Sequence, residues 1–460
     1  MIKINSLRPI ALLLLLVAVA TPLGAQNKKQ REQAKKLQDL GDKSFVAKNF
    51  QDAIDKYGQS IAVVATNPYA HYRKAFAHLE LKQNVEALNE FSTALTQGFK
   101  PLEIYRVRAF IYYQILDYER AAQDIRAGLQ LAPSDLLLLK GLGEVDLAKN
   151  DPAGALEALR QASTIAPNDA DVDYYLARTY AAVGNPASTQ TAAENALKKG
   201  TRFVGETYIL LGGAHDKQHN WSASIDAYTR AIAAKQDNVN VYRNLGEAYR
   251  SEGRYTDAIN AMKQGLRTYP NSGALFTDVS WYYSLADRPQ DAVEAAKAAV
   301  IFLPKEYLGY TNLCRAYNDN KQYDLAINAC NTALRIAPGD GETYFYLGRA
   351  MNLTGKNVEA TKMYSLAVKG LEDYVTKLPD YSDGWYLLGN AYFADNQRDK
   401  AGEAYLKCLQ ISPKYAKARY NLGIIYTRKK MKPAAQEQYN KLLELDPKIA
   451  ALLKAEIDKM

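Results

Sequence analysis

Few side chains in this 460-residue sequence are suited to catalysis, because it has only four histidines and three cysteines. His215 and His219, in "HDKQH", have the i, i+4 spacing that lets two imidazoles bind one metal ion from a single helix face. The glutamate of the H-E-x-x-H zinc motif is missing, and no third ligand follows nearby. His215 also falls in a recurring tyrosine column with Tyr249 and Tyr283, so we interpret it as a core side chain.

The sequence also lacks the common catalytic and cofactor-binding motifs that do not depend on histidine. The sequence has no phosphate-binding P-loop, no G-x-S-x-G nucleophile elbow and no dinucleotide fingerprint after a strand. Its 58 basic and 50 acidic residues are interspersed, with a formal net charge of +8 and no long basic block. We therefore predict that the protein is not an enzyme, uses no cofactor or metal, and has neither a nucleic acid nor a small-molecule substrate as a partner.

The sequence is dominated instead by one repeating pattern. A small residue, usually alanine, recurs at intervals of 34 residues, with one interval of 35 and one of 41. This small-residue slot is held by Ala53, Ala87, Ala121, Ala155, Thr189, Ser224, Ala258, Ala292, Ala326, Ala360, Ala401 and Ala435. A fixed period of this length is the signature of a repeat array with twelve copies.

Each copy contains the pattern of two helices. Small residues recur twelve positions before the slot and, in all copies but the last, seven positions after it. In the copy around Ala258, Tyr242, Leu245, Gly246 and Tyr249 lie on one face of a first helix. The break "EGR" follows, and then a second apolar helix ends at a proline. Small side chains let two helix axes approach closely, so each copy is predicted to be a helix pair.

This pattern resembles the tetratricopeptide repeat, whose signature is W-x2-L-G-x2-Y, then A-x3-F, then P. The octet "WYLLGNAY" from Trp385 to Tyr392 matches its first half. The resemblance implies an all-α, right-handed superhelical solenoid of antiparallel helix pairs, with first helices lining a concave groove. We expect repeats 1–5 at 34–203, repeats 6–10 at 204–381, repeats 11–12 at 382–448, and a capping helix at 449–460.

Two repeats depart from the pattern. Repeat 5 has Thr189 in the alanine slot and the helix breakers "GNPAST", so we expect a weak interface there. Repeat 10 carries seven extra residues before Pro379, which predicts a second helix extended at 368–378. We expect this longer helix to splay the following repeat away from repeat 10.

All three cysteines occupy packing positions. Cys314 replaces the glycine of its first helix, Cys330 faces back from the second helix of the same repeat, and Cys408 lies in a small-residue slot. Three buried thiols are one interpretation. A Cys314–Cys330 disulfide is the alternative if the protein is exported to an oxidising compartment.

Large aromatic, arginine and asparagine side chains recur one step round from the core face, where the resemblance places the groove. Guanidinium and amide groups hold carboxylates and peptide backbone, and aromatic rings add buried area, so we expect a partly acidic protein segment as the ligand. The candidates are Tyr72, Phe76, Arg106, Phe110, Tyr113, Arg243, Asn244, Arg250, Trp281, Asn312, Arg315, Phe345, Arg349, Tyr386, Asn390, Tyr420 and Asn421.

The N-terminus has the pattern of a secretory signal peptide. Lys3 and Arg8 precede an apolar run that is short for a membrane span, and "LGA" before Gln26 suits signal peptidase. We expect a signal peptide at 1–25 and a basic lead-in at 26–33. No cysteine stands at Gln26, so the mature protein is not expected to be a lipoprotein. We predict a periplasmic or extracellular location, with membrane contact only through a partner or an uncleaved signal segment.

These features together predict a non-catalytic, exported scaffold that binds a protein or an extended peptide in its concave groove. The alternative is an accessory or bridging subunit of a cell-envelope assembly or a polysaccharide-export machine.

Overall fold

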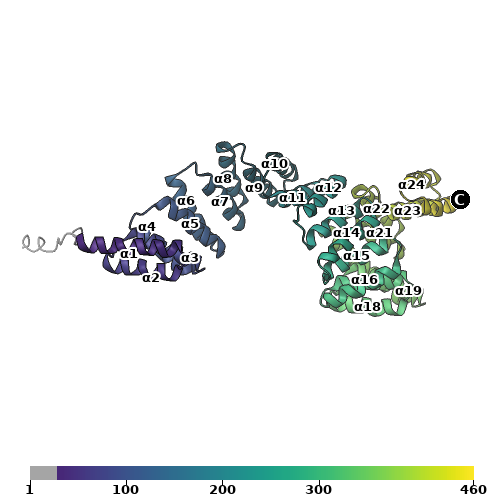
Figure 1. Ribbon diagram of the computed structural model, residues 1–460. Coiled ribbons are helices and arrows are strands. Elements are labelled where there is room, and N and C mark those ends of the chain that lie inside the picture. The colour runs from purple at the N-terminus through teal and green to yellow at the C-terminus, as the bar shows by residue number, and fades with distance from the viewer. Residues whose placement is uncertain (1–27) are drawn as a thin grey trace, which may run out of the picture. The chain divides into compact units, whose positions relative to one another are not determined.

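The computed structural model describes residues 28–460, and within that range every regular element is a helix (Figure 1). The predicted all-α solenoid fold is therefore confirmed. The signal peptide predicted at 1–25 lies outside the described residues. The chain divides into two compact units, the first ending at Ala182 and the second beginning at Val183. This boundary directly precedes "GNPAST", the stretch of helix breakers in the fifth copy of the sequence repeat.

The first unit contains nine of the described helices. They are α1 (Lys28–Val46), α2 (Phe50–Val63), α3 (Pro68–Glu80), α4 (Asn84–Thr96), α5 (Pro101–Gln114), α6 (Tyr118–Leu131), α7 (Leu136–Ala148), α8 (Pro152–Ile165) and α9 (Ala170–Ala182).

The second unit contains the remaining sixteen described helices. They are α10 (Pro186–Lys199), α11 (Val204–Lys217), α12 (Trp221–Ala233), α13 (Val239–Ser251), α14 (Tyr255–Thr268), α15 (Gly273–Leu285), α16 (Pro289–Phe302), α17 (Tyr307–Asp319), α18 (Tyr323–Ile336), α19 (Gly341–Leu353), α20 (Asn357–Lys377), α21 (Ser382–Ala394), α22 (Arg398–Ile411), α23 (Ala416–Arg428), α24 (Lys432–Leu445) and α25 (Pro447–Ile457).

Small residues set the spacing within each helix pair. A Cβ added at Gly389 of α21 would lie 2.5 Å from Cε1 of Tyr405 of α22, so only glycine lets this ring lie flat on the facing helix. Gly212 and Tyr228 repeat the contact in α11 and α12. In both pairs the glycine stands twelve positions before the small-residue slot and the tyrosine four positions after it. All twelve residues of the slot itself are 2% exposed or less.

The turn between the two helices of a pair also follows the repeat. The residue five positions before the small-residue slot adopts positive φ in every copy, from 56° at His219 to 82° at Gly355. Glycine tolerates this left-handed conformation best, yet most copies use lysine, asparagine or another polar residue there. The turn is therefore imposed by the packing of the two helices as well as by its own sequence.

The seven extra residues of the tenth copy lengthen α20 to 21 residues, whereas the other second helices from α2 to α24 have 13 or 14. The helices α20 and α21 remain in contact, and the splaying of the following repeat that we expected from the sequence stays a prediction. The backbones of Gly341 and Gly370 approach so closely that a Cβ on Gly370 would lie 2.8 Å from Cα of Gly341. This contact lets the added turns of α20 lie against the start of α19.

The C-terminal helix α25 covers the end of the solenoid. Ala450, Leu453 and Ile457 are buried against α23 and α24, and a Cβ at Gly423 would lie 2.5 Å from Leu453 Cδ2. Capping of this kind is needed because the last pair of a solenoid otherwise exposes an apolar face. Within residues 28–460, no helix has the length and apolar character that crossing a membrane requires.

Candidate functional site

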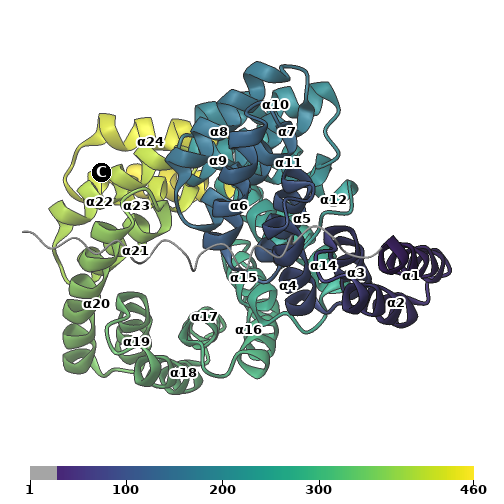
Figure 2. The ribbon, with the colours of Figure 1, turned by 90° about the vertical axis from the view of Figure 1, so that its left-hand side faces the viewer.

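A cavity of about 580 Å³ lies on the inner side of the second unit. The helices α15 to α21 follow a curved path (Figure 2), and residues of α15, α17, α19 and α21 line the cavity. Arg243 of α13 contributes from one side, and Asp373, Tyr374 and Lys377 of the long helix α20 contribute from another. The extra turns of α20 therefore supply part of the wall. A concave site of this size lies within the usual range for ligand pockets.

The curved path brings helices from distant copies into contact. The Arg250 guanidinium of α13 lies 3.0 Å from a carboxylate oxygen of Asp383 at the start of α21, and these side chains are only 4% and 2% exposed. Nearby, Lys414 forms a 2.5 Å ion pair with Glu252, although the two residues are 162 positions apart. Lys417 of α23 also reaches the backbone carbonyl of Ser284. These contacts join the α13 side of the curve to the α21–α23 side.

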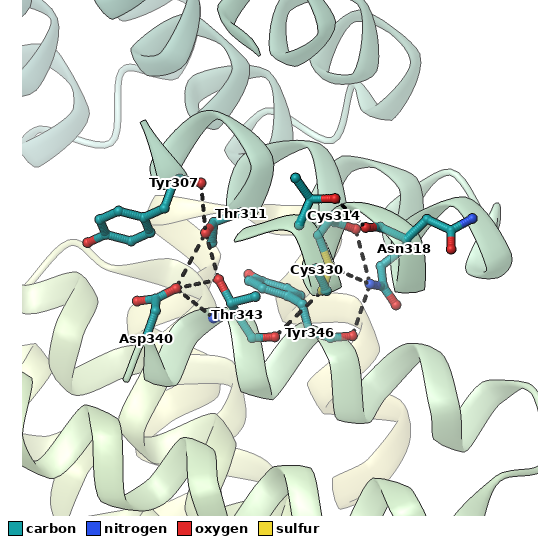
Figure 3. The surroundings of a disulfide bond; sticks show 10 residues. Tyr307, Thr311, Cys314, Asn318, Cys330, Asp340, Thr343 and Tyr346 are labelled. Carbon is teal, nitrogen blue, oxygen red and sulfur yellow. Dashed lines mark hydrogen bonds between the residues drawn. A yellow bond between two sulfur atoms is a disulfide. The ribbon is translucent and has the colours of Figure 1, made fainter. Parts of the chain in front are cut away.

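The helix α17 is fixed to its neighbours beside the cavity (Figure 3). A disulfide joins Cys314 of α17 to Cys330 of α18, with the two Cα atoms 5.2 Å apart. These residues stand sixteen positions apart, in the same two repeat positions as Gly389 and Tyr405, so the covalent bond replaces the glycine–tyrosine contact. Cys408 is a free, buried thiol.

Buried hydrogen bonds add to this disulfide by tying α17 to α19. The hydroxyls of Thr311 and Thr343 lie 2.6 Å apart, and the Asn318 amide donates to the carbonyl of Tyr346 at 3.1 Å (Figure 3). Asp340 caps α19 by accepting from the backbone N–H of Thr343. The position of α17, and of every side chain that it points into the cavity, is therefore closely defined.

Arg315 is the central side chain on the inner face of α17. Its guanidinium carbon lies 3.6 Å from the centre of the Trp281 ring, which is a close cation–π contact. The same group donates to Glu342 at 2.5 Å and to the Asn312 side chain. Arg315 is only 4% exposed at its side chain, and its Nε has no hydrogen-bond partner among the described residues. Its charge is thus already balanced within the protein.

Carboxylates exceed cations around the cavity. Five acidic side chains line it, whereas only the three cations Arg243, Arg315 and Lys377 do so; the acids are Asp278, Asp340, Glu342, Asp373 and Asp383. Burial raises the pKa of Glu342 to about 7, although Arg315 opposes this shift. Burial likewise raises the pKa of Asp278 and of Asp340. Perturbed carboxylates in a concave site mark a functional candidate.

The structure brings four of the sequence-predicted groove residues to this cavity, namely Arg243, Trp281, Asn312 and Arg315. Their arginines do not offer free charge to an acidic ligand, since Arg243 pairs with Asp278 at 2.6 Å and Arg315 pairs with Glu342. The sequence did not reveal these pairings, because each partner belongs to another repeat copy.

The other candidates of the second unit lie outside the cavity wall. Arg250 is buried in the pair with Asp383, and Arg349 forms a 2.8 Å ion pair with Asp319. Several of the remaining candidates contact tyrosines. Asn244 donates a hydrogen bond to the hydroxyl of Tyr228, and the hydroxyl of Tyr405 accepts from Asn421 and donates to Asn390. The rings of Tyr386 and Tyr415 pack together, as do those of Phe345 and Tyr346. Tyr420 packs against the cluster around Leu453.

In the first unit, the predicted aromatic residues mostly form core. Tyr72 is 6% exposed and donates a hydrogen bond to Glu103, and Phe76 packs edge-on against Phe91. Tyr113 packs against Tyr118, and Arg106 forms an ion pair with Asp135. Phe110, by contrast, is 60% exposed.

The two histidines of "HDKQH" do not share a helix face. His215 is buried within α11, as the tyrosine column predicts, whereas His219 lies in the turn after α11 with φ of 56°. Among residues 28–460, no group of three or more histidine, cysteine or carboxylate side chains is placed to hold a metal ion.

Sequence reasoning missed the acidic residues of the cavity. Glu342 and Asp383 hold the same position, eighteen before the small-residue slot, in consecutive copies. Carboxylates at one repeat position in adjacent copies were the available signal. The extra turns of α20, which bring Asp373 and Lys377 to the same cavity, gave no such signal.

Family models match several stretches of the sequence. Models described as tetratricopeptide repeat match residues 209–273, 309–340 and 416–449, and one described as TPR repeat matches 389–430. The chain contains tetratricopeptide repeats. Proteins of this kind act as scaffolds for protein–protein interaction. The matched stretches cover part of the second unit, so the count of twelve repeats stays a prediction.

Curated relatives share only segments with this chain. RNA polymerase II-associated protein 3 of Rattus norvegicus is 24% identical over 213 residues, which are 46% of this chain and 29% of that protein. Small glutamine-rich tetratricopeptide repeat-containing protein 2 of Saccharomyces cerevisiae is 35% identical over 92 residues, which are 20% of this chain and 25% of that protein. The chain thus matches little more than a quarter of the length of these relatives.

Among solved structures, PilW, described as a widely conserved type IV pilus biogenesis factor, has 19% identity and a TM-score of 0.42, covering 46% of this chain and 99% of PilW. The yeast protein Tom70 has 15% identity and a TM-score of 0.41, covering 94% of this chain and 96% of Tom70.

Proposed function

We propose that this protein is an exported, non-catalytic scaffold that binds a segment of another protein in the cavity of its second unit. The observation that carries the proposal is the cavity itself. It is concave, it is lined by side chains from helices α13 to α21, and it combines aromatic and charged groups. Sites with this combination bind ligands through buried apolar area and a few oriented polar contacts.

A protein segment suits this cavity because its lining combines aromatic rings with charged side chains. Trp281, Tyr307 and Tyr374 offer ring surface to the apolar groups of such a segment. The repeats support the same proposal, since proteins that contain them act as interaction scaffolds.

Site-specific photo-crosslinking in the native cell tests the site. A benzophenone side chain at Leu308, which lines the cavity and is 45% exposed, should form an adduct with a partner protein. The matched control is Leu325 on the second helix α18, which is also 45% exposed and does not line the cavity. Equal adducts from both positions, or from Leu325 alone, would place the partner on the outer face and contradict the proposal.

Export is tested separately by fractionation and by sequencing the N-terminus of the mature protein. We expect the protein outside the cytoplasm, with Gln26 as its first residue. A cytoplasmic protein that begins at Met1 would contradict this part of the proposal.

A further inference from the structure

Every cation of the cavity wall already has a carboxylate partner. Arg243 pairs with Asp278, Arg315 with Glu342, and Lys377 with Asp373. Two carboxylates of the wall remain outside these pairs, namely Asp340 and Asp383. Asp340 accepts hydrogen bonds from the backbone and hydroxyl of Thr343 through one carboxylate oxygen, and in this way it caps the start of α19.

Asp383 forms a buried ion pair with Arg250, but its hydrogen-bonding capacity is not used. Its side chain is 2% exposed, yet neither carboxylate oxygen accepts a hydrogen bond within the described residues. The Arg250 guanidinium lies 3.0 Å away but donates through Nε and Nη2 to Glu247, so one cation serves two carboxylates. A buried acceptor without a donor destabilises the folded protein, and a ligand that supplies the donor recovers that free energy.

We propose that the cavity of the second unit binds the guanidinium or ammonium group of an arginine or lysine side chain on the partner's segment, with Asp383 as its principal acceptor. This inference rests on the proposed function and specifies its ligand. It reverses the acidic ligand that the sequence suggested, because the arginines that suggested it are paired internally.

The remaining wall suits such a side chain. Tyr307 and Tyr374 line the same cavity, and the faces of aromatic rings attract cations. Arginine is the stronger candidate of the two, because its planar fork can donate to both oxygens of one carboxylate. The protein as a whole carries a formal charge of +8, so non-specific attraction would favour acidic ligands instead.

The test uses four libraries of nine-residue peptides, identical except for a central arginine, lysine, citrulline or glutamate. Citrulline has the shape of arginine without its charge. The immobilised, oxidised mature protein should retain the arginine and lysine libraries at least 5-fold more than the citrulline and glutamate libraries. Equal retention of arginine and citrulline, or stronger retention of glutamate, would overturn the inference and leave the proposed function standing.

Three variants locate the binding. Asp383→Asn should remove the preference for arginine over citrulline. Because that buried change also disturbs the contact with Arg250, Leu308→Lys serves as a second variant, placing a cation at an exposed position of the wall. It should reduce retention of the arginine library at least 5-fold, whereas Leu325→Lys, at the matched outer position, should leave it unchanged. An equal loss in both lysine variants would contradict binding in the cavity.

A competition arm separates a protein ligand from a free amine. Spermidine should displace the arginine library only at concentrations far above those of the peptides, because it lacks the flanking backbone contacts. If spermidine binds and no peptide library is retained, the inference of a protein side chain is wrong. If nothing is retained and Leu308 forms no adduct in the cell, the proposed function fails with it.

Discussion

The contact between Arg250 and Asp383 gives the sharpest test of how the second unit is held together. Replacing Arg250 by methionine keeps an extended, apolar side chain but leaves the Asp383 carboxylate buried without a cation. Both side chains are at most 4% exposed, so solvent screens the pair little. Removing one partner of such a buried pair destabilises proteins by about 3–5 kcal/mol. We expect Arg250→Met to lower the free energy of unfolding by about 3 kcal/mol.

The reasoning also predicts the effect of removing both charges. The double variant Arg250→Met with Asp383→Leu has no buried uncompensated charge, because Glu247, the other partner of Arg250, is 41% exposed. Replacing a buried ion pair by apolar groups is often neutral or stabilising. We therefore expect it to recover most of the stability lost by Arg250→Met. The recovery would show that the cost comes from the unpaired carboxylate rather than from lost packing of the arginine stem.

Urea denaturation of the oxidised protein, followed by far-UV circular dichroism, measures the loss, and hydrogen exchange locates it. Because the pair joins α13 to α21, exchange should increase in both helices, although an ordinary solenoid couples only neighbouring repeats. The control is Arg254→Met, whose partner Asp257 lies three residues away in an exposed pair, worth at most about 1 kcal/mol. A loss below about 1 kcal/mol for Arg250→Met, or exchange confined to α13, would refute the reasoning.

Two further predictions concern the cysteines and the cavity acid. Replacing Cys314 and Cys330 by alanine opens a loop with a separation of 16 residues and should cost about 3 kcal/mol in the loop-entropy model; dithiothreitol should destabilise the unaltered protein similarly and the variant not at all. Burial raises the pKa of Glu342 to about 7 in the folded state, and the charged groups that act on it there are Arg315, Asp340 and Asp383. Because the ordinary pKa of this carboxyl is about 4.5, the contribution of Glu342 to stability should fall as pH rises from about 4.5 to about 7. Between pH 5 and pH 8 the urea midpoint should therefore fall less steeply in Glu342→Gln than in the unaltered protein. Equal slopes in the two proteins would contradict the raised pKa of Glu342.

Much of the fold was predictable because its determinants are local. The slot at Ala258 and its equivalents, the small residues that accept rings such as Tyr405, and the breaks between helices all recur within one period. Each of these features acts between residues less than about one repeat apart, as expected for a solenoid whose units pack on their neighbours. The pairing of Cys314 with Cys330 follows the same local geometry, because glycine and tyrosine occupy those positions in other copies.

The candidate site was less predictable, because repeat position alone does not say which partner a side chain contacts. Arg243, Trp281, Asn312 and Arg315 line the cavity as their positions suggested. However, the ligand that we propose is basic rather than acidic, because Arg315 pairs with Glu342 and Arg243 pairs with Asp278. These partners stand 27 and 35 residues away, in neighbouring copies where the sequence offers several carboxylates of equal standing.

The sequence by itself determined the helix pairs, their order and the residues that fill the space between them, because those depend on contacts repeated every 34 residues. Only the tertiary structure decided that Arg250 meets Asp383 and that Lys414 meets Glu252, 162 positions away. Such contacts depend on the small rotations between successive helix pairs, summed over several repeats. No single repeat encodes that sum, so the cavity and the buried pair of Arg250 and Asp383 form only when several repeats have packed on one another.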